Sequence, residues 1–192
     1  MKYIISALIV IALCGQVVSQ TRKPMDGRKP FKETEKIDTE LLQALVNRYL
    51  GEQLKQAGAS PVYDDRIVQA ANYQMRHPEI TETTDEDGFH VPAVKVVLKR
   101  NGYACGYVLE LYVEAKTICS TIRNHDASDT YENVAARFVE QFLEGNRVNV
   151  TQSGYKSFGA GVYAYEDWER NESGPILNEP KCTRVKVLFV FL

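Results

Sequence analysis

The chain has little of what several common classes of protein require. It holds four cysteines, three histidines and one tryptophan in 192 residues, and its cysteine spacing is typical neither of a zinc ribbon nor of a thioredoxin site. It also lacks a phosphate-binding loop, a nucleophile elbow and a metalloprotease motif. Charge of one sign does not dominate, because 23 Lys and Arg stand against 25 Asp and Glu. The composition therefore gives no indication of binding to nucleic acid or to an anionic membrane.

One apolar run stands at the start of the chain. Lys2 precedes the apolar residues 4–13, and Val17-Val18-Ser19 supplies short side chains at a cleavage position. This pattern predicts a secretory signal peptide over residues 1–19, with a short membrane anchor as the alternative. No later stretch approaches the roughly 18 apolar residues of a transmembrane helix. We therefore expect a secreted, extracellular protein with no membrane span in the mature chain.

The polar, basic residues 20–37 predict a flexible leader before a single domain over residues 38–192. Cleavage leaves three cysteines, an odd number that favours one disulfide and one free thiol in an oxidising compartment. Cys105 and Cys119 are the preferred pair because they are close in the sequence. Asn149 and Asn171 begin glycosylation sequons, which have meaning only in a eukaryotic source.

Apolar periodicity predicts three main helices, over residues 39–57, 65–76 and 129–144. Asp38 is the expected N-cap of the first helix and Asp64 or Asp65 that of the second, whereas Gly145 is expected to end the third. A short helix is predicted from Pro92 to Arg100, although its β-branched residues leave a strand as the alternative.

Strands are predicted over residues 107–113, 158–165 and 185–192. The last two are expected to pair in an antiparallel sheet, joined by a long polar loop. Because helices come first and strands follow without alternation, the pattern favours an α+β sandwich.

Five elements in this order resemble the CAP superfamily of cysteine-rich secretory proteins, antigen 5 and pathogenesis-related proteins, over about residues 39–192. The matching positions are Asn47, Tyr63-Asp64, Ala70-Ala71, Gly88-Phe89-His90, Leu98 to Tyr103, Glu110, Arg147, Asn149, Tyr155, Gly159, Gly161 and Val162. The resemblance implies an α-β-α sandwich, with helices packed on both sides of a central antiparallel sheet. The chain departs from the family at Leu109 and Leu111 and in lacking a Trp-rich turn, and Asn146 stands where the family has a second His.

In intact members of that family, two His and one or two acids line a cleft and can hold a divalent metal. Here the resemblance implies a degraded cleft of His90, Glu110 and Asn146, with Glu140 or Glu144 as a further carboxylate. We expect no cofactor, and weak or no zinc binding. Two simpler interpretations remain open: His90 is a loop residue bonded to a neighbour, or His90 and Glu110 form a structural ion pair.

The sequence therefore predicts a non-enzymatic extracellular binding or interaction protein, whose partner is a small apolar ligand or another protein. A metal-assisted hydrolase that uses His90 and Glu110 is the first alternative. A secreted factor of an unrelated α+β fold is the second.

Overall fold

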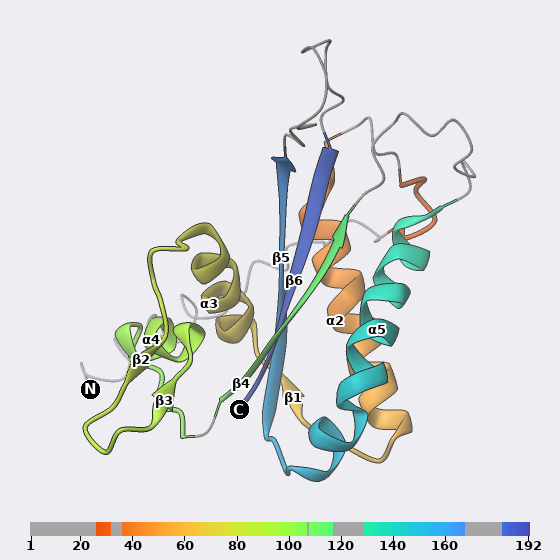
Figure 1. Ribbon diagram of the computed structural model, residues 1–192. Helices are drawn as coiled ribbons and strands as arrows, with labels where there is room; N and C mark the ends of the chain where they lie inside the picture. Colours follow the sequence, from red (N-terminus) through yellow and green to blue (C-terminus); the bar gives the residue numbers. More distant parts are fainter. Residues whose placement is uncertain (1–25, 32–35, 107, 117–128, 168–181) are drawn as a thin grey trace, which may run out of the picture.

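The computed structural model describes residues 26–31, 36–106, 108–116, 129–167 and 182–192 (Figure 1). Helices and strands are both well represented, which confirms the α+β class. In chain order, the named elements are α2 (Thr39–Gln56), β1 (Val62–Tyr63), α3 (Asp65–Arg76), β2 (Thr83–Thr84), β3 (His90–Val91), α4 (Ala93–Arg100), β4 (Leu109–Lys116), α5 (Tyr131–Gln152), β5 (Ser157–Asp167) and β6 (Cys182–Phe191). The predicted signal peptide lies outside the described residues. In the described part of the chain, no helix is both long and apolar enough to cross a membrane.

The predicted helices form where apolar stripes and caps coincide. The side chain of Asp38 accepts a hydrogen bond from the backbone N–H of Leu41 at the start of α2, and Asp64 does the same for Arg66 at the start of α3. Each cap satisfies a backbone donor that the first turn of a helix leaves open. The segment after Pro92 is a helix and not a strand, with Val94, Val97 and Leu98 buried.

The predicted end of α5 at Gly145 is wrong, because the helix continues to Gln152. Leu143 and Val150 are both buried and lie two turns apart, so the apolar stripe continues past the glycine. Gly154, with φ of 67°, follows the helix and takes the left-handed conformation that a turn requires. The longer helix places Asn146 inside α5, whereas the CAP resemblance put it in a turn.

The main sheet has the strand order β1-β5-β6-β4. β6 pairs antiparallel with both β5 and β4, as predicted for the first of these pairs. The prediction of a wholly antiparallel sheet is wrong, because β1 pairs parallel with β5. The reason is that α2 and α5 end at the same end of the sheet, so the strands that follow them start side by side and run in one direction (Figure 1).

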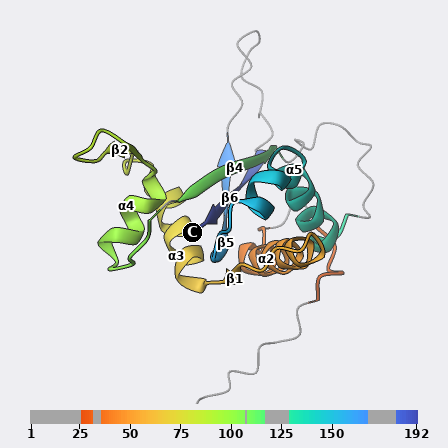
Figure 2. The same ribbon diagram turned by 90° about the horizontal axis from the view of Figure 1, so that it is seen from below.

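Helices α2 and α5 cover one face of the sheet (Figure 2). Phe142 of α5 stacks on Phe189 of β6, with ring centroids 4.2 Å apart, and also faces Phe191. From β5, this face receives Phe158, Ala160 and Val162, which are every second residue of the strand. The result is the larger of the two hydrophobic clusters, and it is continuous from α2 through α5 into the sheet.

Helices α3 and α4 pack against the opposite face in a smaller cluster, which includes Leu188 and Val190 of β6. Glycines of β5 allow α3 to approach the strand closely. A Cβ at Gly161 would lie 2.7 Å from Oδ1 of Asn72 and 2.9 Å from the Cβ of Ala71, and one at Gly159 would lie 3.0 Å from the Cβ of Ile67. Any larger residue at these two positions would push α3 away from the sheet.

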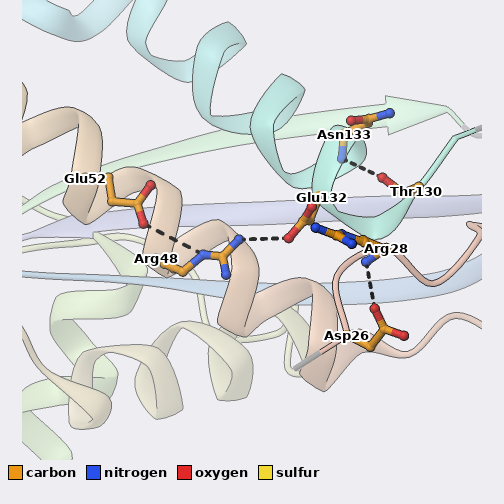
Figure 3. Close-up of polar contacts among 7 residues, drawn as sticks. All are labelled: Asp26, Arg28, Arg48, Glu52, Thr130, Glu132 and Asn133. Carbon is orange, nitrogen blue, oxygen red and sulfur yellow. Dashed lines mark hydrogen bonds and ion pairs between the residues drawn. The ribbon is translucent and has the colours of Figure 1, made fainter. Parts of the chain in front are cut away.

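Part of the segment predicted as a flexible leader is packed against the domain. Pro30 forms a β-bridge with Thr130, and the ring of Phe31 lies 5.0 Å from that of Tyr131. Figure 3 shows this corner of the molecule, where Arg48 of α2 reaches Glu132 in the first turn of α5 with a separation of 3.2 Å. Residues 26–31 therefore belong structurally with the start of α5, which corrects the predicted boundary between leader and domain.

Candidate functional site

Glu110 of β4 is half-buried. Its Oε2 accepts a hydrogen bond of 3.0 Å from the backbone N–H of Val94, in the first turn of α4. That turn begins at Pro92, which supplies no side-chain cap, and it holds no acidic residue of its own. Glu110 therefore caps a helix that lacks a local cap, and its carboxylate faces the positive end of the helix dipole.

Burial raises the pKa of the Glu110 carboxyl above its ordinary value. The Val94 hydrogen bond and the nearby His90 ring act in the opposite direction, while the Glu82 carboxylate adds to the rise. The hydrogen-bond partner of the Glu110 carboxyl is therefore the backbone of α4.

His90 lies on β3, in a two-stranded hairpin with β2. Its side chain is exposed, and Nε2 lies 3.4 Å from Oε2 of Glu82, also on the surface. The interpretation of His90 as a loop residue with a neighbouring partner is the one that fits this geometry. His90 is close enough to Glu110 to affect its pKa.

Asn146 does not share a cleft with Glu110. Glu110 stands directly opposite Val190 in the β4–β6 pair, and Val190 belongs to the cluster under α3 and α4. Asn146 is one turn after Phe142, which packs on the other face, and its side-chain amide donates to the carbonyl of Phe142. Because paired residues of neighbouring strands point to the same face, the sheet separates the two side chains, and the predicted three-residue cleft is wrong.

Metal binding at this place has no support from the geometry. In the described part of the chain, no group of three or more His, Cys, Asp or Glu side chains is arranged to hold a metal ion. Glu140 and Glu144 lie on the exposed side of α5, with Arg137 and Arg147 beside them. A histidine at position 146 would not face Glu110 either, since that position lies beyond the sheet from Glu110.

Two polar clusters near the candidate cleft were missed by sequence reasoning. Asp64 accepts hydrogen bonds from Arg66 at 2.7 Å and from the Tyr103 hydroxyl at 2.8 Å. The Arg66 guanidinium lowers the pKa of Asp64 to about 2. The sequence identified Asp64 as a possible helix cap, but nothing in it pointed to Tyr103, which is 39 positions away.

The second cluster joins Tyr112 of β4 to Gln74 of α3 through a hydrogen bond of 2.6 Å. Burial raises the pKa of the Tyr112 hydroxyl to about 12, and the neighbouring Glu110 adds to that rise. Together with the Glu110–Val94 bond, this contact fastens β4 to both helices of the smaller cluster. These polar contacts join α3, α4 and β4 to one another.

The predicted modification sites have different outcomes. Cys105 is a free cysteine, and Cys119, with which a disulfide was predicted, lies outside the described residues. Burial raises the pKa of the Cys105 thiol, so it is less reactive than an ordinary cysteine. Asn149 is exposed, but it lies on α5 and not in a loop, and Asn171 lies outside the described residues.

The hairpin of β2 and β3 carries the most exposed large apolar side chain of the described residues. Phe89 is 70% exposed, yet its backbone is well held. Oδ1 of Asp85 accepts hydrogen bonds from the N–H of Phe89 at 2.7 Å and of Asp87 at 3.2 Å, and Gly88 has a φ of 83°. A tight turn therefore presents the phenyl ring to solvent.

Comparisons with known proteins give no relative: no family model, no curated protein and no solved structure matches the chain.

Proposed function

We propose that this chain is a secreted, non-enzymatic interaction protein built on a divergent CAP-like domain, in which helices on both sides of the sheet form an α-β-α sandwich. Its partner is another extracellular protein. The observation that carries the proposal is Phe89, a large apolar side chain that is 70% exposed at the turn of a hairpin. Aromatic side chains, phenylalanine included, are enriched at the centres of protein interfaces.

The base of the hairpin is fixed to the domain. Val91 is 5% exposed, and Ile80 packs against the cluster under α3 and α4. From this base the hairpin projects away from the sheet (Figure 2). A ring held this way loses little conformational freedom on binding, which favours its use as an anchor.

A photo-crosslinking amino acid placed at position 89 tests the proposal in the extracellular fluid of the source organism. We expect one discrete cross-linked protein, identified by mass spectrometry, from position 89. Position 148 is the matched control, because Val148 is 63% exposed on α5, which covers the opposite face. Identical products from both positions, or none from position 89, would contradict the proposal.

A small apolar ligand is the second candidate, and one groove favours it. A space of about 450 Å³ lies between the turn after α2 and the turn after α5. Its apolar wall includes Pro61, Val62 and Val150. If the groove binds such a ligand, Val62→Asn lowers the fluorescence of a bound naphthalene dye, whereas Phe89→Ala leaves that signal unchanged.

The metal-assisted hydrolase requires His90 and Glu110 to act on one substrate. No observation favours it, since each of the two has a partner of its own, Glu82 for His90 and Val94 for Glu110. A secreted factor of unrelated α+β fold differs from our proposal in its ancestry. The cross-linking experiment tests for a protein partner in either case.

A further inference from the structure

We propose that Phe89 docks into the apolar face of a basic amphipathic segment, such as a helix with leucines on one side and lysines around them. This inference rests on the proposed function and adds the chemistry of the partner. It is based on the juxtaposition of one exposed ring with side chains of a single charge sign.

Every charged side chain near Phe89 on the hairpin is acidic. Five acids occur between Pro78 and Val91, and no Lys or Arg lies between those two residues. The acids are Glu79, Glu82, Asp85, Glu86 and Asp87. All residues from 81 to 90 are exposed. A partner that buries the phenyl ring must therefore place the residues at the edge of the interface within reach of these carboxylates. The carboxylates attract positively charged side chains at that edge.

Glu79 and Glu82 lie beside His77 and His90. The three acids of the turn, Asp85, Glu86 and Asp87, divide into two roles, which makes the inference testable without unfolding the turn. Asp85 holds the turn, because its side chain accepts two backbone hydrogen bonds. The Glu86 and Asp87 side chains have no hydrogen bond or ion pair with another described residue. Neutralising Glu86 and Asp87 therefore changes the charge around Phe89 while the turn is kept.

The probe is a synthetic amphipathic helix of leucine and lysine, and the measurement is isothermal titration at low and at physiological ionic strength. We expect binding that weakens as salt rises. Phe89→Ala should weaken it about tenfold, as the loss of an interface anchor does. The double variant Glu86→Gln/Asp87→Asn should bind more weakly and with a smaller salt dependence.

Val148→Ala is the matched control, since it shortens an equally exposed apolar side chain on another face, and it should leave binding unchanged. A leucine–glutamate helix should not bind. Failure of the wild-type protein to bind the leucine–lysine helix, or equal binding by Phe89→Ala, would overturn the inference. A cross-linked partner from position 89 would then still support the proposed function, so the two ideas fail separately.

Discussion

The two faces of the sheet are held by different kinds of interaction. On the α2/α5 face, long helices bury aromatic and branched side chains in one continuous cluster. On the α3/α4 face, α3 packs closely over glycines of β5, and both helices are tied to β4 by polar side chains. The stability of the first face depends on the amount of apolar surface that folding removes from water. The second depends on steric fit and on hydrogen bonds at a few positions.

The largest expected effect is on the α2/α5 face. Phe142 is 1% exposed and stacks on two rings of β6. Phe142→Ala should lower the free energy of unfolding by about 3–5 kcal/mol, since it removes a buried ring and leaves a cavity. Urea denaturation measures this value. The exposed Phe89→Ala is the control, and a loss for Phe142→Ala below about 1 kcal/mol would mean that this face is not a packed core.

A smaller effect is expected from overfilling the α3/α4 face. Gly161→Ala should destabilise the protein by about 1–3 kcal/mol, because the added methyl meets the backbone nitrogen of Asn72 as well as side chains of α3. Gly145→Ala is the matched control on α5, where a Cβ meets no atom within 4 Å. It should stabilise the helix by roughly 0.5–1 kcal/mol. Equal effects of the two substitutions in thermal denaturation would contradict the close approach of α3.

The smallest effect concerns the charge of Glu110, and its sign follows from its pKa. Because the folded-state pKa is raised above the unfolded value, the native state holds the proton more tightly. The stability from this group is therefore complete below the unfolded pKa and declines as pH rises through the folded one. Glu110→Gln should flatten that decline and change stability near neutral pH by less than about 1 kcal/mol, since the carboxyl is partly solvated.

Asp64→Asn is the opposite case on the same face. The pKa of Asp64 is lowered to about 2, so its stabilising contribution is present above the unfolded value and is lost as pH falls toward 2. Denaturation at several acid and neutral pH values gives the free energy of unfolding of each variant and of wild type. The difference between wild type and variant should fall with rising pH for Glu110→Gln and rise with pH for Asp64→Asn. Slopes of the same sign would mean that one of the two environments is misassigned.

Much of the fold was predictable because its signals are local. The stripe from Tyr131 to Phe142 and the caps at Asp38 and Asp64 depend on residues within a few positions of one another, and the structure confirms them. The end of α5 was not predictable, because Gly145 is a breaker in isolation. It is tolerated in the helix because Val150, further along, is buried.

The candidate site was predicted poorly, because its residues meet through the sheet and not through the sequence. His90, Glu110 and Asn146 were grouped by resemblance to a family, but the alternation of side chains along β4 puts Glu110 on the face away from α5. The bond from the N–H of Val94 to Glu110 joins a helix to a strand 16 positions later. No periodicity encodes such a contact, since it exists only after the strand has been placed.

The sequence by itself determined which segments become the main helices and the long strands, since apolar period, caps and turn residues act over short distances. Tertiary structure decided three further features: the parallel pairing of β1, the docking of residues 26–31 and the face on which each polar side chain lies. Each depends on which chain segments reach the same end or face of the sheet. That is set by how whole elements pack, because burial of apolar surface is the dominant favourable term in folding and determines which layers are stable.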